Sequence, residues 1–215
     1  MERLICIAIG YACGLFQTAY ILGKIYHIDI RKQGSGNLGS TNVLRTLGKK
    51  AGALNLLCDC LKCIAAILIV RAIFGNSYGD ILPLLSLYAA AGCILGHNFP
   101  FYLNFKGGKG VAASVGLVIA FDWRIFIVCA VVFFALFFTT HYVSLCSLSA
   151  YAVAFILVLV FGHMGKYGMD QPHTMELYIV MAVLTAMAFY RHRANIVRLL
   201  HGTENKVFLS SKNKK

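Results

Sequence analysis

Long apolar runs separated by short polar loops make up most of this chain. They cover residues 4–23, 51–74, 81–96, 111–138, 145–161 and 174–190. About 20 consecutive apolar residues are enough for an α-helix to span the hydrocarbon core of a bilayer. The chain is 59% apolar with a mean hydropathy of +0.73, which is more apolar than soluble domains are. The sequence therefore predicts an all-α polytopic membrane protein, with one domain over residues 1–215.

The run at 111–138 is interrupted by Asp122, Trp123 and Arg124, and it decides the topology. Basic residues are enriched in cytoplasmic loops, so the basic loop after the first run places the N-terminus outside. The tail carries Arg191, Arg193, Arg198, Lys206, Lys212, Lys214 and Lys215. One long helix over 111–138 would put these cations outside, whereas a hairpin broken at the interruption keeps them inside. We therefore expect seven transmembrane or partly spanning helices, with the N-terminus outside and the C-terminus cytoplasmic.

Two features stand out inside the first two runs. Asp59 and Lys62 lie three residues apart on one helical face, and charges at membrane depth are usually paired. A structural ion pair is favoured, with a catalytic role as the alternative. The first run also carries small residues at positions 10, 12, 14 and 19, which are typical of close helix packing in membranes.

Three glycine-rich basic segments, residues 34–45, 96–110 and 192–204, separate or follow these runs. In the first, Gly34, Gly36 and Gly39 allow positive φ and inward-facing amides, while hydroxyls and Arg45 add further donors. This segment lacks the P-loop spacing G-x-x-x-x-G-K-[ST]. It predicts a phosphate cradle, although a linker with turns is the alternative when the segment is taken alone.

The predicted topology brings all three segments to the cytoplasmic face. Their cations include Arg45, Lys106, Lys109, Arg193 and Arg198. Asp29 and Glu204 are the only acidic residues expected on that face, so neither a carboxylate-bound metal nor another cofactor is expected. Because the cations lie between apolar runs, they indicate lipid headgroups or phosphorylated substrates and not nucleic acid. No obligate protein partner is inferred.

The same segments resemble a known family. Ser35–Arg45, Gly96–Pro100 with Phe105–Ala112, and His192–Leu200 with Gly202–Glu204 are similar to the three signature motifs of the PlsY family. Its members are bacterial acyl-phosphate:glycerol-3-phosphate acyltransferases. The resemblance implies transfer of a fatty acyl group from acyl phosphate to the 1-hydroxyl of glycerol 3-phosphate, which gives lysophosphatidic acid and phosphate. This is the first step of phospholipid synthesis. It further implies a multi-pass protein of the bacterial inner membrane, among membrane lipids, with its active site on the cytoplasmic face.

The resemblance also assigns site residues by position. The catalytic residues are Ser35, Arg45, Lys109, Asn195, His97 and His192. The substrate-binding residues are Gly36, Asn37, Gly39, Ser40, Thr41, Asn42, Lys106, Gly107, Gly108, Gly110, Ser144, Ser147, Arg193, Arg198 and Glu204. His141 stands where the family has an arginine, so a phosphate contact at this position is left open. His97, after a helix end, could equally be a helix-terminal hydrogen-bond partner.

The chemistry of an acyl phosphate does not require a covalent acyl-enzyme, because phosphate is already a leaving group. No Ser-His-Asp or Cys-His set is recognisable in the chain. No carboxylate stands beside a histidine in the motifs, so we favour the substrate phosphate oxygen as the proton acceptor over His97 or His192. A membrane transporter of a phosphorylated solute is the alternative function. It would need polar groups deep in the spans, where Asp59 and Lys62 are the main candidates.

Overall fold

The computed structural model describes residues 1–208, and these contain ten α-helices with three short 3-10 helices at Ile30–Lys32, Gly79–Ile81 and Phe101–Leu103. The helices are α1 (Glu2–Gly14), α2 (Thr18–Ile25), α3 (Ser40–Leu47), α4 (Lys49–Phe74), α5 (Leu82–Asn98), α6 (Val111–Phe121), α7 (Trp123–Thr140), α8 (Val143–His163), α9 (Gln171–Arg191) and α10 (Arg193–Leu200). The tail lysines at 212, 214 and 215 lie outside the described residues.

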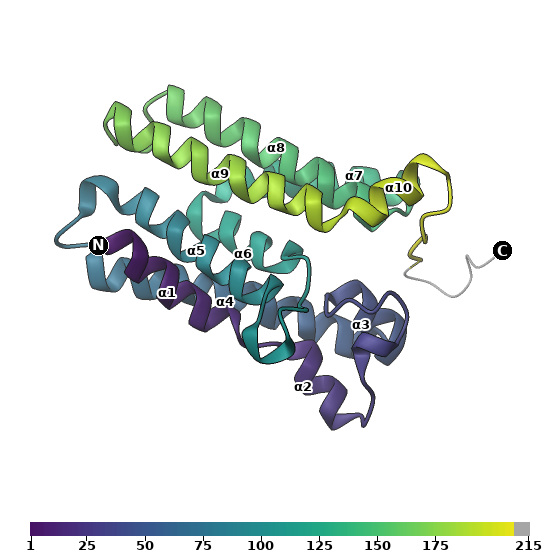
Figure 1. Ribbon diagram of the computed structural model, residues 1–215. Coiled ribbons are helices and arrows are strands. Elements are labelled where there is room, and N and C mark those ends of the chain that lie inside the picture. Colours follow the sequence, from purple (N-terminus) through teal and green to yellow (C-terminus); the bar gives the residue numbers. More distant parts are fainter. Residues whose placement is uncertain (209–215) are drawn as a thin grey trace.

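Within the described part of the chain, six helical segments are long and apolar enough to cross a membrane, and α6 is a shorter apolar helix. The break predicted between α6 and α7 is confirmed. Asp122 leaves the helical conformation, and its carboxylate accepts a hydrogen bond from the Arg124 amide at 3.0 Å as the N-cap of α7. The two helices run in opposite directions as a hairpin (Figure 1).

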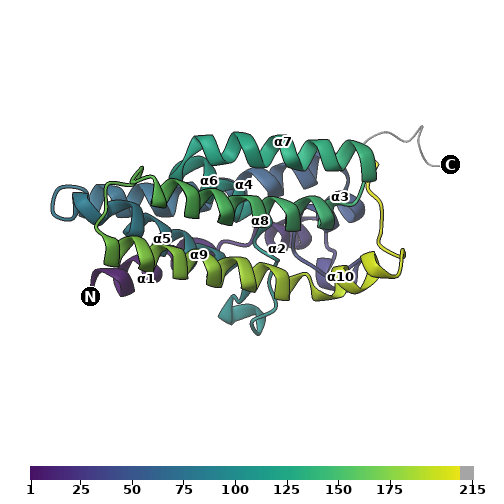
Figure 2. The same cartoon turned by 90° about the horizontal axis from the view of Figure 1, so that it is seen from above.

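Helix α5 is the centre of the fold and packs against α1, α4, α6 and α9. Helices α7, α8 and α9 form a second group beside it (Figures 1 and 2). Figure 1 also shows α2, α3 and α10 together at one end of the bundle, with the N-terminus and the α4–α5 and α8–α9 loops at the other. The first and third glycine-rich segments therefore lie at this end, and the second, between α5 and α6, reaches the third through the bond from Lys109 to Asn195.

Helices α1 and α5 approach so closely that glycine is required at their contact. A Cβ atom on Gly10 would overlap the backbone of Ala89, and one on Gly92 would overlap the backbone of Ile7. Gly14 meets the backbone of Cys93 in the same way. The close packing predicted from the small residues of the first run is confirmed at Gly10 and Gly14.

The first run is not one continuous helix, contrary to the prediction for residues 4–23. Helix α1 ends at Gly14, and α2 begins only at Thr18. Gln17 is buried in the break, where its amide group donates to the carbonyl oxygens of Gly96 at 3.3 Å and His97 at 3.1 Å. The freed carbonyl of Phe16 accepts a hydrogen bond from Lys62 Nζ at 2.7 Å. Broken backbone is tolerated at membrane depth where the protein supplies such partners.

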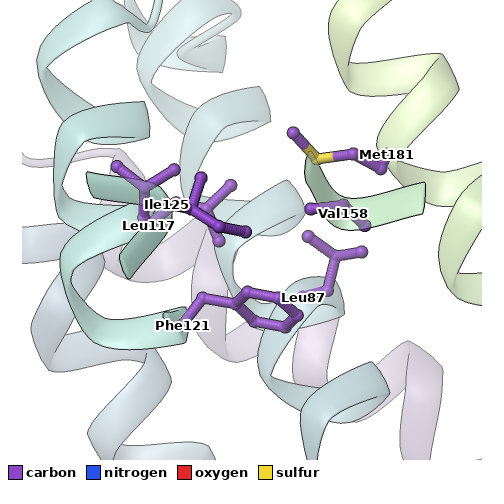
Figure 3. A pocket seen from close by; sticks show the side chains of 7 residues that line it. Leu87, Leu117, Phe121, Ile125, Val158 and Met181 are labelled. Carbon is purple, nitrogen blue, oxygen red and sulfur yellow. The ribbon is translucent and has the colours of Figure 1, made fainter. Parts of the chain in front are cut away.

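The interface between the two helix groups is tightly packed. Figure 3 shows a cavity of about 10 Å³ enclosed by Leu87, Leu117, Val118, Phe121, Ile125, Val158 and Met181. This space is about the size of a single water molecule's probe sphere and is lined only by apolar groups. It belongs to the hydrophobic core and cannot hold a substrate.

Candidate functional site

The loop before α3 is held in shape by Asn42. The Asn42 Oδ1 atom accepts the Ser35 amide at 2.9 Å, and Nδ2 donates to the Gln33 carbonyl at 3.0 Å. Because its amide group is occupied by this backbone, Asn42 shapes the loop instead of offering a free donor. Gly34 and Gly36 have positive φ as predicted, but Gly39 has φ −81° and is the N-cap of α3. The prediction of positive φ at Gly39 is therefore wrong.

The other polar side chains of this loop differ in how far they are already engaged. Asn37 Oδ1 accepts the Gly39 amide at 2.8 Å, and Ser40 Oγ accepts from Asn55 Nδ2 at 2.9 Å. Thr41, in the first turn of α3, is half-buried. Ser35 is exposed, and its hydroxyl makes no hydrogen bond among the described residues. The hydroxyls of Ser35 and Thr41 thus remain available to a ligand, and Ser40, which only accepts, can still donate its proton.

A chain of polar side chains joins the second and third glycine-rich segments. Lys109 Nζ donates to Asn195 Oδ1, and Asn195 Nδ2 donates to Glu204 Oε1 at 3.0 Å. The other oxygen of Glu204 accepts from Arg198 Nε at 2.9 Å. We call Lys109, Asn195, Arg198 and Glu204 the polar cluster. It contains two cations and one carboxylate, so it retains a net positive charge for an incoming anion.

Arg45 connects the first segment to this polar cluster. Its guanidinium donates to the Asn205 carbonyl at 3.3 Å, directly after Glu204 in the chain. Together these contacts bring five sequence-predicted residues to one place: Arg45, Lys109, Asn195, Arg198 and Glu204.

Burial alters the ionisation of two groups beside the polar cluster. Burial, opposed by Glu204 and assisted by the neighbouring arginines, lowers the pKa of Lys109 to about 8. Burial, followed by the charge of Lys109, lowers the pKa of His192 to about 4. His192 Nδ1 lies 2.8 Å from the Ala188 carbonyl, which can only accept, so we assign the proton of the neutral ring to Nδ1. At pH 7 the site therefore presents a neutral histidine and a lysine that is mostly charged.

The glycines before Lys109 lie directly against His97. The amides of Gly107 and Gly108 donate to the carbonyls of Asn98 and His97, each at 3.1 Å. A Cβ atom on Gly108 would overlap the His97 imidazole. From the opposite side, the guanidinium of Arg191 donates to the Gly108 carbonyl at 2.6 Å. Gly110, with φ +83°, then begins α6. The loop is thus fixed from both sides and delivers Lys109 to the polar cluster.

His97 itself belongs to a buried group in the interior of the bundle. Asp59 and Lys62 form the predicted ion pair at 2.8 Å. Lys62 Nζ lies 2.9 Å from His97 Nδ1, and Asp59 Oδ1 lies 3.6 Å from the same nitrogen. Asn55 donates to Asp59 Oδ2 at 2.9 Å and also to Ser40. We call Asn55, Asp59, Lys62 and His97 the buried network.

The buried network corrects one premise of the sequence analysis. A carboxylate does stand beside a histidine, because α4 places Asp59 next to the end of α5. The motifs alone could not reveal it, since Asp59 belongs to a spanning helix and not to a loop. Asn55 was also missed, although its position one helical turn before Asp59 in an apolar run was an available signal. Arg191 was missed because it looked like one more cation of the basic tail.

Several predicted substrate-binding residues lie outside the polar cluster. Lys106 is exposed, and the exposed Arg193 stacks on the Tyr190 ring at 4.4 Å. Ser147 Oγ donates to the Val143 carbonyl at 2.7 Å. Ser144 Oγ, in the first turn of α8, is buried without a hydrogen-bond partner among the described residues, so it remains free to contact a substrate. Residues 1–208 contain no group of three or more His, Cys, Asp or Glu side chains that could hold a metal ion.

His141 contacts two aromatic side chains. Its ring lies 4.7 Å from that of Phe208 and 5.9 Å from that of Phe137. Its carbonyl accepts the Val207 amide at 2.9 Å, which fastens the segment after α10 to the α7–α8 turn. Within the described residues this histidine is therefore an anchor for the C-terminal segment.

Comparison with known proteins places this geometry in a family. The family model described as "Glycerol-3-phosphate acyltransferase" matches residues 4–202. The glycerol-3-phosphate acyltransferase of Clostridioides difficile (strain 630) is 44% identical over 206 residues, which cover 95% of each chain. The glycerol-3-phosphate acyltransferase of Bacillus cytotoxicus is 43% identical over 208 residues, with 96% of each chain covered.

Solved structures agree with this assignment. The crystal structure of PlsY (YgiH), an integral membrane glycerol 3-phosphate acyltransferase, in its glycerol 3-phosphate form is 33% identical and superposes with a TM-score of 0.83. The match covers 97% of this chain and 96% of that one. The lysophosphatidic acid form gives a TM-score of 0.80 at the same identity. The predicted resemblance is confirmed, and the chain belongs to the glycerol-3-phosphate acyltransferase family, as an integral membrane enzyme of the PlsY type.

Proposed function

We propose that this acyltransferase takes its acyl group from acyl phosphate and transfers it to the 1-hydroxyl of glycerol 3-phosphate, releasing lysophosphatidic acid and phosphate. The observation that carries the proposal is the polar cluster, in which Lys109 and Arg198 are held by Asn195 and Glu204 beside Arg45. Three cations with one carboxylate suit two phosphorylated substrates. The homologues are named acyltransferases, so the alternative function as a transporter is not favoured.

The main task of such a site is to hold two anions together. Arg45, Lys109 and Arg198 offset the repulsion between the two phosphate groups. Correct alignment of two reactants is worth roughly 7–11 kcal/mol of the barrier, and hydrogen-bond donors aimed at the developing oxyanion add to this. Ser35, Thr41 and Ser144, whose hydroxyls make no side-chain bond among the described residues, are the proposed donors.

The proton of the attacking hydroxyl goes to the phosphate oxygen of the acyl phosphate. This oxygen has a pKa near 6, by comparison with other phosphate esters. His192, whose pKa is lowered to about 4 by burial, is a weaker base than that oxygen. The Nδ1 atom of His97 already accepts from Lys62 at 2.9 Å, so it is not free to take up a proton. We therefore assign positioning roles to both histidines.

The buried network positions the two glycine-rich loops relative to each other. Asn55 reaches Ser40 of the first loop, and His97 supports Gly108 of the second. Both residues are joined through Asp59 and Lys62 on α4. A rigid connection of this kind fixes the distance between Arg45 and Lys109, on which substrate alignment depends.

We place the site on the cytoplasmic face of the bacterial inner membrane. The first and third basic glycine-rich segments lie at one end of the bundle (Figure 1), and Lys109 of the second contacts Asn195 of the third. Basic loops favour the cytoplasm. Seven crossings, with the α6–α7 hairpin counted as two, place the two termini on opposite sides, so a cytoplasmic C-terminus leaves the N-terminus outside.

Cysteines introduced at Lys106 and Thr203 should react with an impermeant maleimide only in inverted vesicles, and those at Ser77 and Lys166 only in intact cells. Labelling of Thr203→Cys in intact cells would reverse this orientation.

The direct test is an assay of the purified protein with acyl phosphate and labelled glycerol 3-phosphate. We expect labelled lysophosphatidic acid, no product when free fatty acid replaces acyl phosphate, and full activity in excess EDTA. Strict dependence on added Mg²⁺, or equal use of another acyl donor, would contradict the proposal.

A further inference from the structure

A polar cavity lies at the end of the bundle opposite the candidate site. It has a volume of about 730 Å³ and is formed by the C-terminal turn of α4, the start of α5, the α6–α7 turn and the α8–α9 loop. Its cations are Arg71, Arg124 and Lys166, and Asp122 is its carboxylate. Apolar side chains, including Leu82, Pro83, Ile119 and Phe121, form the remaining walls. The cavity therefore combines three cationic side chains and one carboxylate with apolar walls.

One cation in this cavity lacks an anionic partner. Arg71 is half-buried in the last turn of α4, and its guanidinium makes one hydrogen bond, from Nε to the hydroxyl of Ser86 at 3.2 Å. No carboxylate forms an ion pair with Arg71 within residues 1–208. Its two terminal nitrogens are left without a protein acceptor in that part of the chain. These nitrogens are accessible to solvent and are therefore open to an anion from outside.

Four other cations of the spanning helices have partners within the protein, whereas Lys24, Lys49 and Lys50 are exposed at helix ends. Arg3 is paired with Glu176 at 2.5 Å, Lys62 with Asp59, and Arg124 with Asp122 at 2.7 Å. Arg191 donates to two backbone carbonyls. Since Arg124 already neutralises Asp122, the positive charges of Arg71 and the exposed Lys166 remain unbalanced in the cavity. The cavity carries a net positive charge that the protein itself does not offset.

We propose that this cavity binds the phosphodiester headgroup of an anionic glycerophospholipid of the surrounding bilayer. The phosphate accepts hydrogen bonds from Arg71 and is attracted by Lys166, while the acyl chains leave along the apolar walls. Trp123 at the rim is 65% exposed, as is common for tryptophan at the membrane interface. The hydroxyl of Tyr167, which also lines the cavity, has no partner among the described residues. The site is separate from the polar cluster and does not depend on the proposed reaction.

The chain supplies its own probe, because Trp123 is its single tryptophan. The full-length protein is reconstituted in phosphatidylcholine vesicles that contain a fixed fraction of brominated phosphatidylglycerol or, separately, of brominated phosphatidylcholine. Bromine quenches tryptophan fluorescence on contact. A selective site gives stronger quenching by the anionic lipid, whereas non-selective lipid contact gives equal quenching by both.

Arg71→Gln should lower the excess binding constant of the anionic lipid about fivefold, the effect of one basic residue near a charged lipid. Lys166→Gln, an exposed position that does not affect the core, should have a similar effect. Lys49→Gln, at the other end of α4, makes the same charge change away from the cavity and should leave the excess intact. Acyltransferase activity in phosphatidylcholine shows that each variant is folded.

Two results would overturn the proposal. One is equal quenching of the wild-type protein by both brominated lipids. The other is loss of the excess when inorganic phosphate or glycerol 3-phosphate is added at millimolar concentration, because the cavity would then take a soluble phosphate and not a lipid.

Discussion

Lys109 donates a hydrogen bond to the side-chain oxygen of Asn195, although 86 positions separate the two residues in the chain. This bond closes the polar cluster, because Asn195 also reaches Glu204 at 3.0 Å. It fixes the direction of the ammonium group that we propose contacts substrate phosphate.

The first prediction concerns this bond. Asn195→Ala removes one hydrogen bond to a charged group, which costs about 1.5–3 kcal/mol and lowers kcat/KM about ten- to two-hundred-fold. Steady-state kinetics with both substrates measure the loss. Asn76→Ala, an exposed residue at the opposite end, is the matched control and should be unchanged. A value for Asn195→Ala within twofold of wild type would contradict the role of the bond.

The second prediction concerns pH. The pKa of Lys109 is lowered to about 8 by burial, so the ammonium is charged below this pH and neutral above it. We expect kcat/KM, which reports the free enzyme, to fall as the pH rises through about 8. Bound phosphate favours the charged form and raises this pKa, so the fall in kcat should lie at higher pH. Lys109→Arg stays charged throughout. An alkaline fall that persists unchanged in this variant would assign the titration to another group.

The third prediction separates positioning from base catalysis at His192. Asparagine can replace the Nδ1 donor that faces the Ala188 carbonyl but cannot accept a proton at pH 7. His192→Asn should therefore retain clearly more activity than His192→Ala, and the acidic limb of kcat/KM should not move. Equal and nearly complete inactivation of both variants in the acyl-transfer assay would instead identify His192 as the general base.

The fourth prediction concerns Ser35. No histidine or carboxylate forms a hydrogen bond with Ser35 among the described residues, and its amide is held by Asn42, so its hydroxyl should bind and not attack. Ser35→Ala should lose about 1.5–3 kcal/mol, or roughly ten- to two-hundred-fold in rate. Intact mass measured after incubation with acyl phosphate alone should show no acyl adduct. A stoichiometric adduct that disappears in Ser35→Ala would establish double displacement.

The fifth prediction tests the ion pair of the buried network. Asp59→Leu or Lys62→Met leaves one buried charge unpaired, which costs about 3–5 kcal/mol of stability. Thermal unfolding in detergent should show both single variants well below wild type and the double variant closer to it. The double variant should still have a low kcat/KM, because His97 loses its bond from Lys62. Full activity in a stable double variant would show that the network does not position the loops.

The fold could be predicted where composition alone decides the outcome. Apolar length located the spans, and the charge of the tail required the break that Asp122 makes between α6 and α7. The break at Gln17 was missed because its cause is distant in the sequence. Its partners are Lys62, Gly96 and His97, and no local pattern at residues 15–17 encodes them.

The candidate site was likewise predicted where the motifs define it and missed where distant contacts do. Motif positions located Lys109, Asn195 and Glu204, which the structure joins. The motifs could not distinguish residues that face the cluster from those that shape the loops. Asn42 was therefore predicted to bind substrate, and His97 was left open between catalysis and a helix-terminal hydrogen bond. Arg193 has the same charge as Arg198, but only Arg198 points toward Glu204. That difference depends on the bend at His192 between α9 and α10, which residue type alone does not specify.

The interrupted first span has a consequence for biogenesis. The carbonyl of Phe16 and the side chain of Gln17 find their partners on α4 and α5, which the ribosome synthesises later. In a nascent chain that has inserted only its first span, the Phe16 carbonyl has no such partner and the Gln17 amide group has only the Gly14 carbonyl. The first span thus reaches its final conformation only after the third has entered the membrane. The first hundred residues of this enzyme therefore depend on one another during insertion, and truncation before α5 leaves the Gln17 side chain without the carbonyls of Gly96 and His97.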